Sequence, residues 1–181
     1  MNNVRPIKVP INLDKRRYIV FDLNAFAKLD EIYGNKHEAL LSLQSGLLRH
    51  VRVWLWAGLL HEGEDLTVED VGQMFTLSKK EVIEEITNNI LQSASANLPQ
   101  AKPGQDNQPM PTEQEINTGW DWDWMYYMGT TLLGMKEDEF WRSTVRKLFA
   151  LWDVHVRVNG LGKQESDQKT SAPPGYIDQF I

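Results

Sequence analysis

Two aspartates separated by a single residue, Asp121 and Asp123, stand between tryptophans and are the first candidates for chemistry in this chain. Aromatic platforms and paired carboxylates recur in glycosidase sites, so this pair would suit a small hydrolase. On a helix, however, side chains two residues apart point in different directions. Both aspartates also lie where a helix N-terminus favours negative charge. Helix capping is therefore the favoured interpretation, and a hydrolase using this pair is a lesser alternative.

The histidines do not follow a metal-binding pattern. His50 and His61 flank an expected helix, and acidic residues follow the second of them, but no His-x-x-x-His pair occurs. A zinc site needs several ligands that converge, and the absence of cysteine excludes thiolate ligands, disulfides and a thiol nucleophile. The sequence also lacks a glycine-rich phosphate loop and a nucleophile elbow. We therefore expect no catalytic residue, no metal and no cofactor.

Residues 66–82 have the sequence pattern of a helix-turn-helix motif, in which two capped helices are joined by a tight turn. In a DNA reader the start of the second helix enters the major groove, where Lys79 and Lys80 would contact phosphates or guanine. Three glutamates follow within five residues and would repel the phosphates. Two packed helices without a nucleic-acid partner are favoured, and a helix-turn-helix DNA-binding regulator is the main alternative.

The densest aromatic stretch lies between Gly119 and Gly134. Helical spacing divides its large side chains into two faces, and both faces are apolar. Such a helix must be covered on both sides, partly by a partner, and large amphipathic side chains suit binding better than bond-making. The first face holds Trp120, Trp124, Tyr127 and Thr131, and the second holds Trp122, Met125, Tyr126 and Leu132.

Residues 119–160 form an expected module that is too small to complete a core alone. It must pack on the rest of the chain, on a second copy, or on another protein. Tryptophan and tyrosine at helical spacing are most often core residues, which is the competing interpretation. The side chains expected to bind a partner are Trp120, Trp122, Trp124, Tyr127, Trp141 and Trp152.

The amino-acid composition is that of an ordinary acidic globular domain. The chain has 181 residues, is 41% hydrophobic and has a formal net charge of -6. Its average field therefore opposes phosphate backbones and anionic membranes. The longest apolar run, 53–60, is far shorter than the roughly 20 residues that span a bilayer. The N-terminus lacks the apolar core of a signal peptide, so we expect a soluble cytoplasmic protein without a membrane partner.

The hydrophobic pattern predicts a mainly α fold in which an N-terminal β-hairpin precedes a helical bundle. Alternating apolar residues before position 21 indicate the hairpin, with Pro10 on an edge strand. Asn24 is expected to cap a helix that stops at Gly34. Further helices are expected over about 36–45 and 47–61, from Thr67, and from a capping box at Ser78. In the last of these helices, Val82, Ile83, Ile86, Ile90 and Leu91 form the apolar stripe.

A change in composition divides the chain. Residues 98–118 are rich in proline and glutamine and contain almost no large apolar side chain, so they are expected to form a flexible linker. The expected organisation is a hairpin and helical domain over 1–97, this linker, a small aromatic-rich helical module over 119–160, and a tail over 161–181. In the module, an acidic helix start follows Gly134, and a longer helix ends at Asn159 and Gly160.

Four stretches resemble a known family. Residues 21–34, 48–62 and 66–72 resemble the tail assembly chaperones of long-tailed, siphovirus-like bacteriophages and the related tail proteins of gene transfer agents. Residues 133–153, in which a leucine-glycine turn precedes acidic residues and Phe-Trp, look like the second module of that system. The resemblance covers about 17–98 and 119–158, and the order and spacing of the motifs carry it.

This resemblance implies a non-catalytic chaperone in the cytoplasm of the infected bacterial host, absent from the mature virion. Such a protein binds the long helical tape measure protein, keeps it soluble and recruits tail tube subunits, and self-association is expected. In many members a programmed ribosomal frameshift adds the second module. The proline-rich linker is the expected place of that junction.

Overall fold

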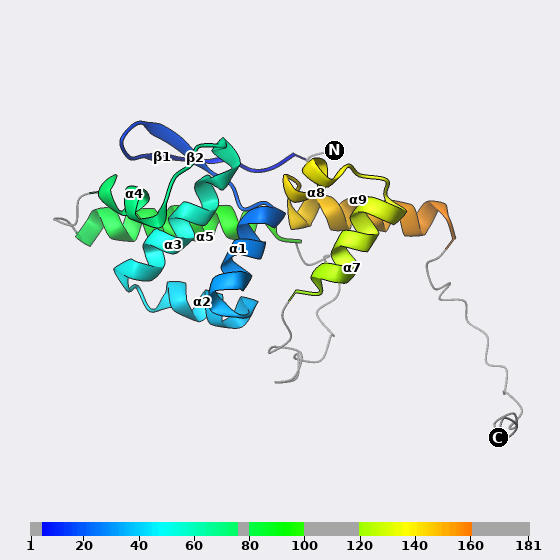
Figure 1. Cartoon of the computed structure of the whole chain (residues 1–181), viewed down its shortest axis with the longest axis horizontal. Coiled ribbons are helices and arrows are strands. Elements are labelled where there is room, and N and C mark those ends of the chain that lie inside the picture. Colours follow the sequence, from blue (N-terminus) through cyan, green and yellow to red (C-terminus); the bar gives the residue numbers. More distant parts are fainter. Residues whose placement is uncertain (1–4, 76–79, 100–119, 161–181) are drawn as a thin grey trace, which may run out of the picture.

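The computed structural model describes residues 5–75, 80–99 and 120–160. The fold is mainly helical with an N-terminal two-stranded antiparallel hairpin, as the hydrophobic pattern predicts. Figure 1 shows the hairpin and the first five helices at one end of the described chain, and the C-terminal helices at the other. No helix in these residues is long and apolar enough to cross a membrane. Most of the expected linker and the whole tail lie outside the described residues.

The hairpin consists of β1 (Val9–Asn12) and β2 (Arg16–Ile19), with Val9 opposite Ile19. Both strands are edges because the sheet has only these two strands, and an edge tolerates Pro10. Alternate side chains face the core, so Val9, Ile11 and Ile19 are buried while Pro10 is exposed. The predicted hairpin and its proline position are confirmed.

Arg17 occupies a buried position of this alternation although it is charged, because its guanidinium lies in a cluster of carboxylates. It pairs with Asp14 at 2.7 Å, Glu62 at 2.6 Å and Glu64 at 2.9 Å. The hydrogen bond and charge of Arg17 lower the pKa of Asp14 to about 2. The cluster fastens the hairpin to the turn that follows the central helix.

Helices α1 (Leu23–Tyr33) and α2 (Lys36–Gln44) follow the hairpin. The N-cap of α1 is Asp22, whose carboxylate accepts a hydrogen bond from the Ala25 amide at 2.9 Å. The prediction of Asn24 as the cap was therefore wrong, because Asp22 is the last extended residue and Asn24 is already helical. Gly34 ends the helix in the left-handed conformation, with a φ of 83°, as predicted.

Helix α3 (Leu48–Leu59) continues into a short 3-10 turn, η1 (Leu60–Glu62), and forms the centre of the core. Trp54 is 1% exposed, and its indole donates hydrogen bonds to the Ala39 carbonyl and the Ser42 hydroxyl. A side chain at Gly58 would clash with Ile19, so glycine permits the hairpin to approach this helix. The buried residues of α3 are Val51, Trp54, Leu55, Ala57, Gly58 and Leu59.

Helix α4 (Val68–Gln73) begins with the predicted cap at Thr67, which forms a reciprocal capping box with Asp70. Helix α5 (Lys80–Asn97) follows, and the capping box expected at Ser78 lies outside the described residues. Of the expected stripe on α5, Ile86 and Ile90 are buried, Val82 and Ile83 are half-buried and Leu91 is 38% exposed. The stripe is therefore narrower than predicted.

The C-terminal part contains α7 (Trp122–Tyr127), the π-helical turn η2 (Met128–Leu132), α8 (Glu137–Trp141) and α9 (Val145–Val158). The expected turn at Gly134, the acidic start of α8 and the end of α9 at Asn159 are present. The buried residues of this part join the same hydrophobic cluster as α1 and α3. They are Met125, Met128, Met135, Phe140, Val145 and Leu148.

Candidate interaction site

The aspartates between the tryptophans shape the start of α7. The Asp121 carboxylate accepts a hydrogen bond from the Trp124 amide at 3.0 Å, so Asp121 is the N-cap, as the capping interpretation predicts. Asp123 lies in the first turn of the helix and is exposed. Negative charge at both positions favours the helix N-terminus. The hydrogen bond gives Asp121 a structural role.

An inner row of aromatic rings runs from the N-terminal part of the chain into the C-terminal helices. Phe26 of α1 lies 5.6 Å from Trp120, Trp120 lies 6.0 Å from Trp122, and Trp122 lies 6.3 Å from Trp141. Tyr126 extends the row, with its ring 6.1 Å from that of Trp141. The three tryptophans are half-buried, so this row joins two parts of the fold.

A hydrogen bond fixes the inner row to α1. The Trp122 indole Nε1 donates to Asp30 Oδ2 at 2.9 Å, across 92 residues of sequence. Phe26 and Asp30 are four residues apart on α1, which places them on one face of that helix. Sequence analysis did not identify Asp30 as a site residue. The spacing of Phe26 and Asp30 on α1 does not predict that Asp30 will bond a tryptophan far away in the sequence.

An outer row of aromatic rings, Tyr127, Trp124, Trp152 and His155, lies on the other side of α7. The rings of Tyr127 and Trp124 are 6.0 Å apart, and Trp124 meets Trp152 edge to face at 5.7 Å. His155 stacks on Trp152 at 5.4 Å. Trp124 is 42% exposed and Tyr127 is 48% exposed. Trp124 and Tyr127 are therefore open to solvent, while Trp152 and His155 are half-buried beside them.

The structure agrees in part with the two helical faces expected for the aromatic segment. Trp124 and Tyr127 share the outer side, while Trp122, Met125 and Tyr126 belong to the inner side or to the core. Trp120 departs from the expectation because α7 begins only at Trp122. Helical spacing therefore does not place Trp120, which packs on Phe26 instead.

The C-terminal helices pack on the N-terminal part of the chain. The Leu23 amide donates to the Ser143 carbonyl at 2.8 Å, and Arg146 Nη2 donates to the Arg5 carbonyl at 2.7 Å. These bonds lie beside the shared hydrophobic cluster. The aromatic module was expected to pack on the rest of the chain, on a second copy or on another protein. On its inner side, it packs on the rest of the chain.

A glycine lets the π-helical turn pack tightly. A side chain at Gly129 would clash with the buried ring of Phe140 and approach Leu148. The turn is π-helical, with the Leu133 amide bonded to the Met128 carbonyl. The close approach holds α8 and α9 against η2, and thereby fixes the position of Trp141 and Trp152.

Burial raises the pKa of Asp22 to about 6, although the backbone hydrogen bond and the charges of His61 and Arg142 oppose this rise. Asp22 immediately precedes Leu23, whose amide bonds the C-terminal part. The carboxyl group therefore caps α1 beside the joint between the two parts of the fold.

The two central histidines have local hydrogen-bond partners. The ring of His50 bonds the Tyr33 hydroxyl at 2.9 Å, and burial lowers the pKa of this histidine. His61 Nε2 lies 2.7 Å from the Tyr18 carbonyl. Within residues 5–75, 80–99 and 120–160, no group of three or more His, Asp or Glu side chains converges on a metal site.

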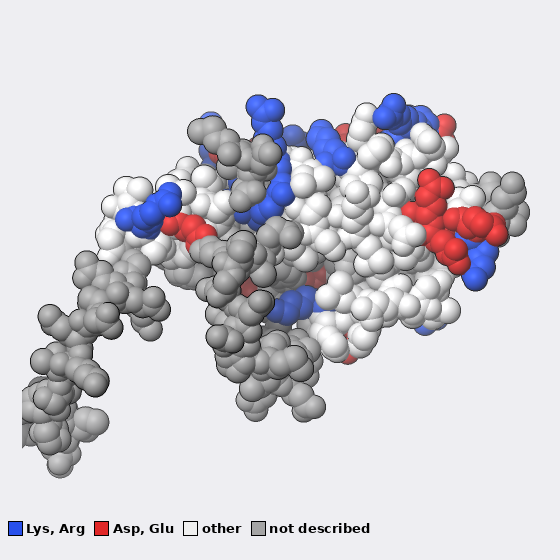
Figure 2. Space-filling model, turned by 180° about the vertical axis from the view of Figure 1, so that it is seen from behind, with Lys and Arg blue, Asp and Glu red and all other residues white. Residues whose placement is uncertain are grey.

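Charge at the start of α5 does not form a basic surface. Lys80 pairs with Glu84 at 3.2 Å on an exposed helix face, and Lys79 lies outside the described residues. Figure 2 shows one face of the molecule, on which the described Lys and Arg side chains lie in several separate groups with uncharged areas between them. A surface that binds nucleic acid would need these basic side chains to form one continuous positive patch.

No protein-family model, curated protein or solved structure matches this chain. The structure divides the six tryptophans and tyrosines expected to bind a partner into two sets. Trp120, Trp122 and Trp141 belong to the inner row, and Trp124, Tyr127 and Trp152 belong to the outer row.

Proposed function

We propose that this protein is a phage tail assembly chaperone that binds the tape measure protein in the cytoplasm of the infected host and keeps it soluble. The outer aromatic row is the observation that carries the proposal. Its exposed rings form a rigid surface with both apolar and hydrogen-bonding atoms, which is the composition of interface hot spots. The order and spacing of the stretches that resemble the chaperone family support the same function.

A long helical protein is a suitable partner for such a surface. An isolated amphipathic helix exposes an apolar stripe that favours aggregation, and contact with aromatic side chains removes that stripe from water. The rings of Trp124 and Trp152 meet edge to face, so they are held before the partner arrives. Preorganisation of this kind reduces the entropy lost on binding.

The same proposal includes recruitment of tail tube subunits and self-association. The N-terminal surface offers exposed apolar side chains remote in sequence from the outer row, among them Ile32 at 49% and Leu47 at 47% exposure. Exposed side chains of this type are available for a second contact while the outer row holds the first. Light scattering of the purified protein measures self-association directly.

Co-expression tests the proposal. The protein would be produced together with a candidate tape measure protein, and the soluble fraction of the latter would be compared with its fraction in the absence of the chaperone. We expect a several-fold increase that depends on the outer row. An unchanged soluble fraction, combined with salt-sensitive retention on duplex DNA, would instead favour the DNA-binding regulator.

A further inference from the structure

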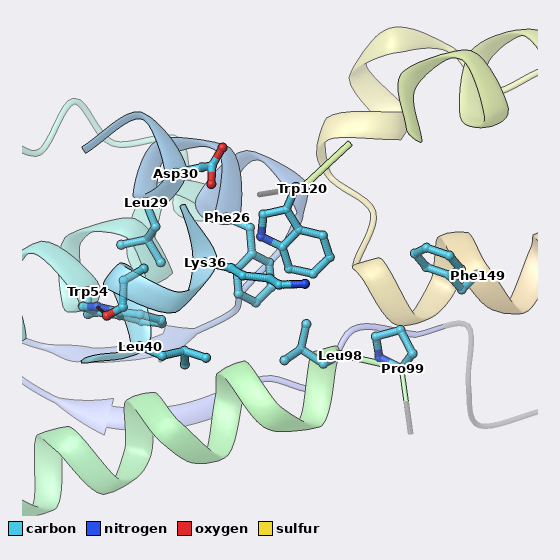
Figure 3. Close-up of a pocket in the computed structure, with 11 residues that line it drawn as sticks. Phe26, Leu29, Asp30, Lys36, Leu40, Trp54, Leu98, Pro99, Trp120 and Phe149 are labelled. Carbon is cyan, nitrogen blue, oxygen red and sulfur yellow. Dashed lines mark hydrogen bonds between the residues drawn. The ribbon is translucent and has the colours of Figure 1, made fainter. Parts of the chain in front are cut away.

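A largely apolar groove of about 390 Å³ lies between the two parts of the fold. Figure 3 shows its walls: Phe26 and Leu29 of α1, Leu40 of α2, Trp120, and Phe149 of α9. The polar side chains in its lining are Asp30 and Lys36. The groove therefore offers many apolar contacts and few hydrogen bonds.

The lining restricts the conformation of a peptide that would enter the groove. Most of its residues come from helices, three lie just after α5 or before α7, and the hairpin contributes none of them. An extended peptide would bury backbone N–H and C=O groups without a strand edge to pair them, which is costly. An α-helix pairs its own backbone groups and presents only side chains. The groove therefore favours a helical occupant with an apolar face.

Lys36 indicates the charge of that occupant. Its ammonium group lies 5.8 Å from the centre of the Trp120 ring, and the structure records no ion pair for it with another described residue. The residue is exposed at the first position of α2. A carboxylate beside the apolar face of the incoming helix would pair with this cation at the edge of the groove.

We infer that this groove binds an amphipathic helix of a partner protein, with apolar side chains inserted between Trp120 and Leu40 and an acidic residue facing Lys36. Phe149 lines the groove, and Trp152 of the outer row follows three residues later, on a neighbouring position of α9. One long helix can thus contact the groove and then the outer row. The inference rests on the proposed function only for the identity of the protein that carries the helix.

A matched pair of leucines provides the test. Leu40 and Leu41 are neighbours on α2 and are 42% and 44% exposed, but only Leu40 lines the groove. The probe is a synthetic amphipathic peptide roughly five turns long, with leucine at i, i+3, i+4 and i+7 and glutamate beside that stripe. Calorimetry would give its Kd for the full chain, for Leu40→Glu and for Leu41→Glu, and a scrambled peptide would be the control.

We expect Leu40→Glu to weaken binding by about tenfold or more, while Leu41→Glu changes it by less than about twofold. A charge exchange gives a second readout: Lys36→Glu should weaken binding of the glutamate peptide and strengthen binding of the same peptide with lysine in that place. Glutamate suits the first turn of a helix, so this variant should retain the melting temperature of the parent.

Four results would overturn the inference: no saturable binding, equal binding of the scrambled peptide, equal effects of the two leucine variants, or no charge exchange. Residues 100–119, which adjoin Pro99 and Trp120 of the groove, are the intramolecular alternative. Binding that appears only after residues 104–115 are replaced by glycine and serine would assign the groove to the chain itself, against the inference. Peptide binding without solubilisation of a tape measure protein would refute the proposed function and leave the groove assignment intact.

Discussion

Each of the two aromatic rows takes a tryptophan and a tyrosine from the same short helix, α7, yet the surroundings of these side chains differ. Trp122 is half-buried, donates a hydrogen bond to Asp30 of α1, and its ring lies beside those of Trp120 and Trp141. Trp124, two residues later, is 42% exposed, and its ring contacts only involve the outer row. Aromatic density alone therefore does not distinguish a side chain that holds the fold from one that is available to a partner.

Substitution of Trp122 gives the largest expected difference in stability between the two rows. Replacing it with alanine removes a packed indole and leaves the Asp30 carboxylate without its donor, so we expect a loss of about 3 kcal/mol in the free energy of unfolding. Urea denaturation measures this loss. Trp124→Ala is the matched control, with an expected loss of about 1 kcal/mol. Equal losses would show that the two rows do not differ in their structural role.

The second prediction concerns the turn that positions both rows. Gly129→Ala places a methyl group against the ring of Phe140. Overpacking of this kind costs about 2 kcal/mol of stability. Thr131→Ala is the control in the same turn, because Thr131 is exposed. A surface substitution of this type should change stability by less than about 0.5 kcal/mol. A neutral effect of Gly129→Ala in thermal denaturation would contradict the close packing of η2 on α8.

The third prediction concerns the pH dependence of stability at Asp22, which lies where the C-terminal helices contact the start of α1. The folded pKa of Asp22, about 6, lies above its usual value of 3.8, so the folded state binds the proton more tightly. This group therefore adds stability as pH falls from about 7 towards about 4, and that contribution is lost as pH rises through 6. Asp22→Asn keeps a good helix cap and should remove this component from the pH dependence of urea denaturation. An unchanged profile would show that Asp22 is not the responsible group.

Hydrophobic periodicity predicted the hairpin and the helices, and capping residues predicted most of the helix ends, because both signals depend on residues close in sequence. Gly34 and Thr67 are examples, since a left-handed C-cap and a capping box are local devices. The cap of α1 was misplaced by two residues because Asp22 and Asn24 both suit that position by type. The choice depended on where the extended backbone ended, and sequence alone did not determine that point.

The candidate site was predicted as a set of residues but not as an arrangement. Helical spacing correctly grouped Trp124 with Tyr127, which are one turn apart. The pairing of Trp122 with Asp30 and the packing of Trp120 on Phe26 span more than ninety residues of sequence. Such contacts arise from the way the C-terminal helices dock, and no local pattern specifies them.

The central claim is that the outer row binds the partner while Trp122 of the inner row holds the fold. The decisive measurement is the soluble fraction of a co-expressed tape measure protein, taken together with the melting temperature of each chaperone variant. Tyr127→Ala and Trp124→Ala are the test variants, and Tyr18→Ala is the control, because Tyr18 is an exposed tyrosine of the hairpin.

We expect each outer-row variant to lose about 2 kcal/mol of binding or more and to solubilise much less of the tape measure protein, with a melting temperature close to that of the parent. Tyr18→Ala should solubilise it as well as the parent does. Full solubilisation by both outer-row variants would contradict the account, and so would an equal loss of solubilisation in the Tyr18→Ala control.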